Sequence, residues 1–374
     1  MRRFTPEMSE IAPVPDRIVF AGGGTGGTVG PGIAVAERLA EIEPSIEVVF
    51  ICSDRAVDRR LLEPGGWEHL TTPARSPGIR PRQGIGFVRG WYGTRRIARR
   101  LLEPSDRCRV VALGGFVAPP VVREAVRRRV PVDLLNLDAV AGRANRWIAR
   151  RASRCFTAVP SDLPTAGDPV GVPLRRAVLP DGPATSHREA LGLRPDLPTL
   201  LVTGASQGAA SIDRMMIDLA RRRTEWFSGW QILHLAGSDN VETLVRTYRE
   251  CSLDAIVRPF LDRMGDAWGA ADLAITRGGA SSIAEVVASR TPAIVIPYPW
   301  HEDQHQARNA ASIARAGAVV VLSDPVRGPA TLPPLESAVS RLLRSAEERI
   351  RMHEAFGPAP GDAATAFARA LVSP

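Results

Sequence analysis

The chain has 374 residues, 44% of them hydrophobic and 24% charged, which is the composition of an ordinary globular protein. Its length favours two domains, since single hydrophobic cores rarely grow beyond about 250–300 residues. The net charge is +8 and every basic side chain is an arginine, so the surface would attract phosphate groups. No RNA-binding or helix-turn-helix signature accompanies this charge, and we expect no nucleic-acid partner.

The cysteines and the N-terminal segment indicate the compartment. The chain has four scattered cysteines, Cys52, Cys108, Cys155 and Cys251, and none of them forms a CxxC pair. This spacing favours neither a zinc site nor a disulfide framework. The first residues lack the apolar core of a signal peptide, and no run of about 18 apolar residues occurs. We therefore expect a cytoplasmic protein with a flexible tail over residues 1–16.

From residue 17 onward, short apolar runs alternate with amphipathic helical patterns, as in a doubly wound parallel sheet. The first half predicts helices at Ile33 to Ile42 and Ala144 to Ala152, among others. It predicts strands at residues 17–22, 45–53, 109–115, 132–137 and 154–159. A stretch rich in Pro and Gly, residues 161–184, then interrupts the pattern and is interpreted as a linker.

The second half starts like the first, with an apolar strand that leads into a glycine loop and a helix. Further strands are predicted at residues 231–237, 255–261, 273–279, 293–299 and 318–322. We expect an α/β protein with two Rossmann-like domains that face each other across a cleft. Their predicted bounds are 17–172 and 173–348, and residues 349–374 are expected to form helices that pack back on the first domain.

The first glycine loop is Phe20–Ala40, FAGGGTGGTVGPGIAVAERLA. Its glycines allow positive φ angles and close approach of a ligand, and the following helix start favours an anion. The GxGxxG pattern within it is a weak sign of dinucleotide binding, because no convincing acidic residue ends the next strand. The alternative is a tight turn without a ligand.

Two loops of the second half are also candidates for binding. In TGASQGA, Thr203 to Ala209, Ser206 and Gln207 could donate to phosphate oxygens, or Ser206 could simply cap a helix. Ser282 and Glu285 have the spacing of a capping box, but a carboxylate at this position could equally bind vicinal hydroxyls. His301 and His305 have i,i+4 spacing, but no third ligand is evident and we expect no metal.

The segment Gly78–Pro104 interleaves seven arginines with aromatic and aliphatic residues. Such a pattern suits an anionic membrane surface, although a solvated helix with an ordinary core face fits equally well.

Together these segments resemble the MurG family of glycosyltransferases, which is family 28 with the GT-B fold. The similarity runs from about Arg17 to Val321 with the motifs in the same order. They are GGGTGGTVGPGIAVAERL, LGGFVAPPVV, DAVAGRANRWIARRA, VGVPLR, LLVTGASQGA, PFLDRM, ADLAITRGGASSIAEVVA and PYPWHEDQHQARNA. The resemblance implies inverting transfer of GlcNAc from UDP-GlcNAc to the undecaprenyl-pyrophosphoryl-muramyl-pentapeptide (lipid I to lipid II) in peptidoglycan synthesis.

The resemblance also implies a donor site mostly in the second domain. Arg175 and Ser206 would hold the diphosphate, Leu261 would lie against uracil, and Glu285 would accept from the ribose hydroxyls. The start of that helix would contact diphosphate and ribose: Ala280, Ser281, Ser282, Ile283 and Ala284. Residues that would contact the GlcNAc hydroxyls or close over the donor are Gln306, Asn309, Thr25, Gly26 and Gly27.

No metal or cofactor is needed for this chemistry in GT-B enzymes, since positive groups at the diphosphate stabilise the leaving UDP. The family uses the part of the first domain that corresponds to Gly78–Pro104 to dock on the cytoplasmic face of the membrane. The resemblance therefore implies a peripheral membrane protein whose partners include the lipid-linked acceptor, an anionic membrane surface and other cell-wall synthesis proteins.

The acceptor side departs from the family pattern. Thr28 stands in this chain where the family loop GGTGGH has a histidine. A threonine hydroxyl cannot act as a general base near neutral pH. The family motif HEQN is replaced by residues 135–138, so Asp138 is the nearest candidate base, or else a structural residue at a helix start. We favour an active transferase. The alternatives are a homologue with a changed lipid acceptor, a weakly active scaffold that binds UDP-sugar at the membrane, and, more distantly, a nicotinamide-dependent oxidoreductase.

Overall fold

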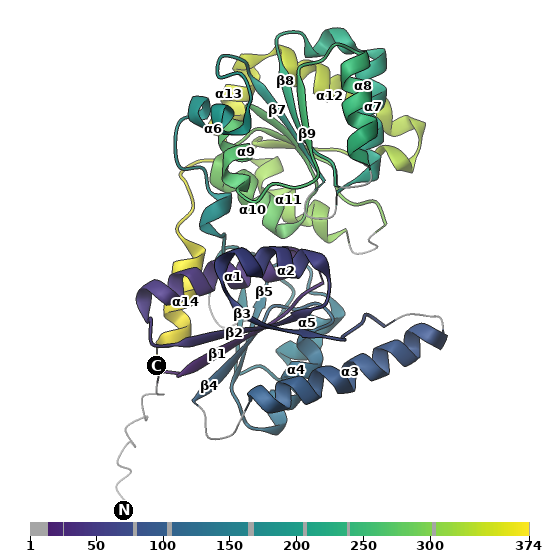
Figure 1. Ribbon diagram of the computed structural model, residues 1–374. Coiled ribbons are helices and arrows are strands. Elements are labelled where there is room, and N and C mark those ends of the chain that lie inside the picture. The colour runs from purple at the N-terminus through teal and green to yellow at the C-terminus, as the bar shows by residue number, and fades with distance from the viewer. Residues whose placement is uncertain are drawn as a thin grey trace, which may run out of the picture.

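The computed structural model describes residues 14–24, 26–77, 81–102, 107–163, 168–204, 208–237, 240–300 and 304–373. Within them the chain forms two sheets of six parallel strands, one below the other in Figure 1, each with helices around it. This arrangement confirms the predicted α/β class with two Rossmann-like halves. We call the half with β1–β6 the first unit and the half with β7–β12 the second unit.

The first unit has the strand order β3-β2-β1-β4-β5-β6. Its strands are β1 Arg17–Ala21, β2 Glu47–Ser53, β3 Glu68–Thr72, β4 Cys108–Ala112, β5 Val132–Asn136 and β6 Arg154–Thr157. Its helices are α1 Gly26–Ile42, α2 Ala56–Leu62, α3 Pro81–Leu101, α4 Ala118–Arg127 and α5 Arg143–Ala149. The central strands are buried almost throughout because helices cover both faces of a parallel sheet.

The second unit repeats this plan with the order β12-β11-β10-β7-β8-β9. Its strands are β7 Thr199–Thr203, β8 Gln231–Leu235, β9 Ala255–Arg258, β10 Leu273–Thr276, β11 Ala293–Val295 and β12 Val319–Val321. Its helices are α6 Ala184–Leu191, α7 Ala210–Arg222, α8 Val241–Glu250, α9 Met264–Ala270, α10 Ala280–Ser289, α11 His305–Arg315, α12 Leu332–Arg344 and α13 Ala346–Glu354.

The C-terminal helices divide between the two units. α14, Ala363–Val372, lies against α1 in the first unit, where Phe367 is fully buried and stacks edge-on against Phe156. Arg38 of α1 forms an ion pair with Asp362, which directly precedes α14, and this contact binds the start of α14 to α1. α13 differs from the expectation, because its buried Met352 belongs to the core of the second unit.

Two elements differ from the sequence-based predictions. α1 begins at Gly26 rather than Ile33, because burial of Val29 and Ile33 overrides the low helix propensity of the glycines and of Pro31. β3 was not predicted, since its sequence EHLTT is polar and largely exposed at the edge of the sheet. No helix in the described ranges is long and apolar enough to span a bilayer.

Candidate functional site

A small cavity of about 50 Å³ lies where the two units meet. Its walls come from the start of α1, from the linker and from the first turns of α10. The lining residues are Gly30, Pro31, Pro173, Leu174, Arg175, Val178, Ser281 and Glu285. The structure thus brings together Arg175, Ser281 and Glu285, which the sequence analysis placed at the donor site.

Glu285 and Arg175 form the charged part of this cavity. Glu285 accepts a hydrogen bond from the indole Nε1 of Trp268 at 2.8 Å. Burial raises the pKa of Glu285 to about 7, although the Trp268 hydrogen bond and the charge of Arg175 both act in the opposite direction. Burial likewise lowers the pKa of Arg175, against the attraction of nearby carboxylates, and the guanidinium remains a cation.

The capping-box interpretation of Ser282 and Glu285 is wrong. α10 begins at Ala280 after Gly279, and no side chain caps it, so Glu285 lies too far along the helix to reach its first amides. Ser282 is buried, whereas Ser281 lines the cavity. Within the described residues, the hydroxyl of Ser281 is buried without a hydrogen-bond partner, so it can serve a ligand.

Asn309 connects the two units by hydrogen bonds. Its Nδ2 donates to Asp138 Oδ1 at 3.0 Å and to the carbonyl of Gly278 at 3.2 Å. Its Oδ1 accepts from the backbone N–H of Ala139 at 3.1 Å. Asp138 follows β5 and Gly278 follows β10, so the carboxyl ends of the two sheets face each other here, where open α/β sheets bind ligands.

Asp138 is positioned by its own unit as well. The side chain of Asn136 donates to the carbonyl of Asp138 at 2.7 Å and to the hydroxyl of Ser161 at 3.1 Å. Asn145 donates in turn to Asn136 Oδ1 at 2.9 Å. α5 begins at Arg143 without a side-chain cap, so Asp138 does not lie at a helix start, although its carboxylate does make a structural hydrogen bond, with Asn309.

Gln306 turns its side chain toward the backbone. Its Oε1 accepts from the N–H groups of Gly278 and Tyr298 at 3.3 and 2.8 Å. It therefore holds the loop after β10 against the loop after β11. Leu261, predicted to lie against uracil, packs partly buried against the core of the second unit.

The first glycine loop is held by a carboxylate that the sequence analysis missed. The buried Asp58 of α2 accepts from the N–H groups of Gly24 and Ser53 at 2.9 and 3.0 Å. Gly24 has φ +98°, and a Cβ there would meet the ring of Phe116 at 2.4 Å, so only glycine fits. Thr28, just beyond this loop, has its methyl group near Gly115 in the loop after β4.

Arg277 is a second group that the sequence analysis missed. It is buried after β10, where it donates to Asp324 at 2.6 Å and to the hydroxyl of Ser211 at 2.8 Å. Ser211 also donates to Asp324 at 2.7 Å. The sequence analysis placed Arg277 only in the predicted strand 273–279, and its partners lie 66 and 47 residues away, beyond the range of local patterns.

Some predicted residues lie outside the described part of the chain. These are the tail residues 1–13, Thr25, Ser206, Gln207, His301 and both ends of the segment 78–104. Gly26 and Gly27 begin α1, and Ile283 and Ala284 lie in α10. The role of the loop around Ser206 in binding the donor diphosphate therefore stays a prediction.

Comparison with known proteins identifies the family. The glycosyltransferase family 28 N-terminal domain matches residues 18–157, and the glycosyltransferase family 28 C-terminal domain matches residues 199–369. The crystal structure of Acinetobacter baumannii MurG has a TM-score of 0.68 at 24% identity, covering 96% of this chain and 99% of that chain. This likeness confirms the GT-B fold.

Curated relatives carry the name UDP-N-acetylglucosamine–N-acetylmuramyl-(pentapeptide) pyrophosphoryl-undecaprenol N-acetylglucosamine transferase. That of Sorangium cellulosum is 35% identical over 366 residues, covering 94% of this chain and 84% of the relative. That of Acidithiobacillus ferrooxidans is 35% identical over 363 residues, covering 96% and 97%. The chain belongs to glycosyltransferase family 28.

Proposed function

We propose that this protein moves GlcNAc from UDP-GlcNAc to the undecaprenyl-pyrophosphoryl-muramyl-pentapeptide, converting lipid I to lipid II in peptidoglycan synthesis. Relatives that match nearly all of the chain carry the name of this reaction. The observation that carries the proposal is the cavity between the units, in which a guanidinium, a carboxylate and an unpartnered hydroxyl converge within the described residues. This set suits a charged, hydroxyl-rich ligand.

The donor site in this proposal uses the walls of the cavity. Arg175 binds the diphosphate of UDP together with the hydroxyl of Ser281 and the first amides of α10, because both a guanidinium and a helix start attract anions. Glu285 accepts from the ribose hydroxyls. Positive groups at the diphosphate stabilise the charge that develops as UDP leaves, which accelerates the reaction.

The acceptor site in this proposal lies in the first unit. Asp138 takes the proton from the attacking sugar hydroxyl, since Thr28 cannot do so near neutral pH. The interunit hydrogen bond from Asn309 holds this carboxylate at the donor side. The displacement is direct and inverts the anomeric carbon, so no covalent intermediate forms on the enzyme. We assign residues 17–172 to the acceptor and 173–348 to the donor.

The membrane-facing surface in this proposal is α3, which extends along the lower side of the first unit (Figure 1). Ile85, Val88 and Tyr92 are 57%, 51% and 64% exposed and follow one another at helical spacing, so they share a face. Exposed arginines lie beside them on the helix: Arg82, Arg89, Arg96, Arg99 and Arg100. This combination suits adsorption to an anionic bilayer surface.

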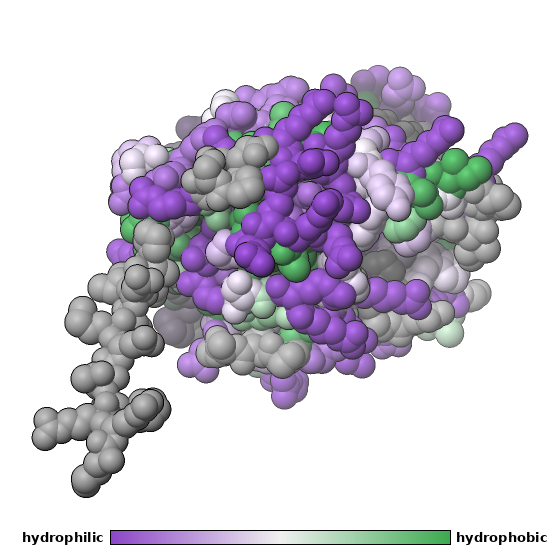
Figure 2. Space-filling model, turned by 90° about the horizontal axis from the view of Figure 1, so that it is seen from below, coloured by the Kyte–Doolittle hydropathy of each residue, from purple (hydrophilic) through white to green (hydrophobic). Residues whose placement is uncertain are grey.

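The view from below supports this assignment of the surface. Figure 2 shows mostly hydrophilic side chains with scattered apolar groups, and one cluster of these lies at the side toward which α3 projects in Figure 1. Peripheral binding of this face would bring the acceptor unit to a lipid-linked substrate on the cytoplasmic side. Other cell-wall synthesis proteins could assemble there.

The test measures UDP release from UDP-GlcNAc with a lipid I analogue in detergent. Turnover in the wild type, with loss of UDP affinity in Arg175→Ala, is the expected result. Tight UDP binding without turnover on any lipid-linked muramyl acceptor would overturn the proposal in favour of a UDP-sugar-binding scaffold. Absence of any uridine-nucleotide affinity would overturn both.

A further inference from the structure

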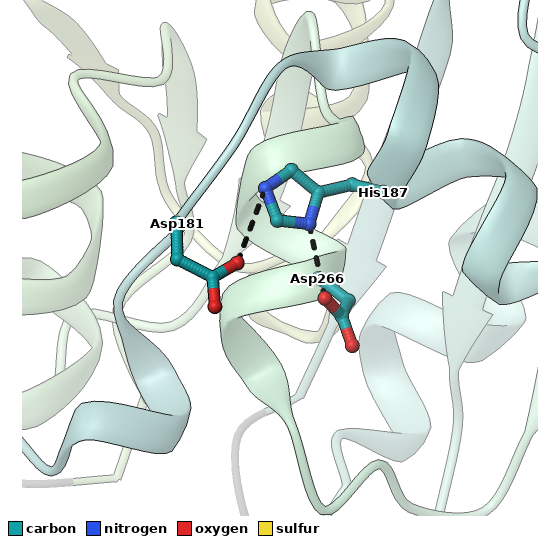
Figure 3. A group of neighbouring side chains, drawn as sticks. All are labelled: Asp181, His187 and Asp266. Carbon is teal, nitrogen blue, oxygen red and sulfur yellow. Dashed lines mark hydrogen bonds and ion pairs between the residues drawn. The ribbon is translucent and has the colours of Figure 1, made fainter.

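His187 lies between two carboxylates, Asp181 of the linker and Asp266 of α9 (Figure 3). It belongs to α6 and is only 4% exposed. Its Nδ1 bonds Asp266 Oδ1 at 3.0 Å. A carboxylate only accepts, so Nδ1 carries a proton, and in this tautomer of the neutral imidazole the lone pair lies on Nε2. Within the part of the chain that the structure describes, this buried Nε2 has no hydrogen-bond partner.

The third side chain, Asp181 of the linker, faces that lone pair. Its Oδ1 lies 3.9 Å from His187 Nε2, which is too long for a hydrogen bond. Two ligand atoms that each lie about 2.0–2.1 Å from a tetrahedral zinc ion are about 3.3 Å from each other. A small movement of the linker would bring Asp181 Oδ1 to this distance from His187 Nε2. The ligand atoms that the three side chains offer all lie within 4.8 Å of one another.

The packing fixes the imidazole in this orientation. A Cβ on Gly269 of α9 would come within 2.2 Å of His187 Cδ2, so the ring lies directly on the helix backbone. Asp266 completes the support, because a carboxylate on one ring nitrogen is the usual way in which proteins orient a metal-binding histidine. The Asp181 side chain is 67% exposed, which gives an ion a path from solvent.

We propose that His187 Nε2 and the carboxylate of Asp181 bind a divalent transition-metal ion of the zinc type, with Asp266 orienting the ring. One imidazole nitrogen and one carboxylate are ligands that suit Zn²⁺, and water fills its remaining positions. The site is separate from the transfer reaction, since none of its residues lines the cavity between the units.

Arg263 limits the affinity of this site. Its guanidinium donates to Asp181 Oδ2 at 3.0 Å and to Asp266 Oδ2 at 3.2 Å. Because Arg263 binds the Oδ2 atoms, the Oδ1 atoms of Asp181 and Asp266 remain directed toward His187. The positive charge of Arg263, however, repels a cation. The ion would fasten the linker to α9 of the second unit, because Asp181 belongs to the linker segment that also carries Arg175 to the cavity.

The experiment titrates the chelator-treated full chain with Zn²⁺ by calorimetry and with Co²⁺ by visible absorption. The wild type is expected to bind one equivalent with nitrogen and oxygen ligation and no thiolate charge-transfer band. Asp181→Asn and His187→Gln should weaken binding at least tenfold, and Asp266→Asn by about 10–100-fold, the usual effect of losing an orienting partner. Arg263→Ala should bind more tightly than the wild type.

The matched control is His69→Gln, which removes a partly buried histidine of β3 in the first unit and should leave the affinity unchanged. Asp181 is exposed, so its substitution tests the site even if replacement of the buried His187 disturbs folding. Binding that is equal in Asp181→Asn and wild type would overturn the proposal as adventitious. Absence of binding in both the wild type and Arg263→Ala would overturn it as well.

Discussion

Asn309 and Asp138 are 171 residues apart in the chain, yet Asn309 Nδ2 donates to Asp138 Oδ1 at 3.0 Å where the two units meet. The other end of the same carboxamide accepts from the N–H of Ala139. One side chain of the donor unit therefore holds the loop after β5 at two points. Asp138, the acidic residue among residues 135–138 that replace the family motif HEQN, therefore lies against the donor half of the protein.

If Asp138 accepts the proton of the acceptor hydroxyl, Asp138→Ala and Asp138→Asn should both lower kcat by about 10²–10⁴-fold, as is typical when a general base is lost. Asp138→Asn is the sharper test, because its amide oxygen can still accept from Asn309 while it no longer takes a proton. The measurement is UDP release at saturating donor. A kcat of Asp138→Asn equal to wild type would show that the carboxylate only holds the units together.

Thr28 should matter much less than Asp138. The Thr28 hydroxyl can position the acceptor but cannot take its proton near neutral pH. We expect Thr28→Ala to lower kcat/KM by less than about tenfold, since one neutral hydrogen bond contributes about 0.5–1.5 kcal/mol. Thr28→Ser keeps the hydroxyl and serves as the control. A hundredfold loss in Thr28→Ala with an active Thr28→Ser would contradict this role.

Glu285 should make the stability of the protein depend on pH. Its pKa is about 7 in the folded protein against 4.5 for an ordinary glutamate, so the folded state binds this proton more tightly than the unfolded chain. The stabilising contribution is present below pH 4.5 and is lost as the pH rises through 7. This contribution is on the order of 3 kcal/mol, since one pKa unit corresponds to about 1.4 kcal/mol.

This dependence is measured by urea unfolding of wild type and Glu285→Gln at pH 5 and pH 8. The wild type should lose more stability between these values than the variant, because glutamine does not titrate. Glu347→Gln is the control, since the Glu347 side chain is 81% exposed in α13. The same pH dependence in all three proteins would contradict the raised pKa.

The exposed face of α3 can be tested with vesicles that contain anionic phospholipid. Ile85→Glu or Val88→Glu should weaken binding about tenfold or more, because full burial of such a side chain contributes about 1.5–3 kcal/mol and the new charge is repelled. Ile350→Glu is a matched control, as Ile350 in α13 is 58% exposed and Ile85 is 57% exposed. Equal binding by all variants, with UDP release intact, would remove α3 from the membrane contact but leave the transferase proposal standing.

Much of the fold could be predicted because its signals are local. Each buried strand of a parallel sheet is a short apolar run, and glycines mark the turns that follow β1 and β10. Arg175, Ser281 and Glu285 were predicted together through the family resemblance, and the structure gathers them around one cavity. The polar edge strand β3 was missed because its residues carry no apolar pattern.

The sequence by itself determined two strand–loop–helix halves, their glycine turns and the residue types available for a charged ligand, because periodicity and turn chemistry act over a few neighbouring residues. Only the tertiary structure decided the partners: Trp268 for Glu285, Asp58 for Gly24 and Asn309 for Asp138. The first two contacts form within one unit each and the third where the units meet, and the hydrogen bond that each polar group finds on burial depends on elements distant in the chain.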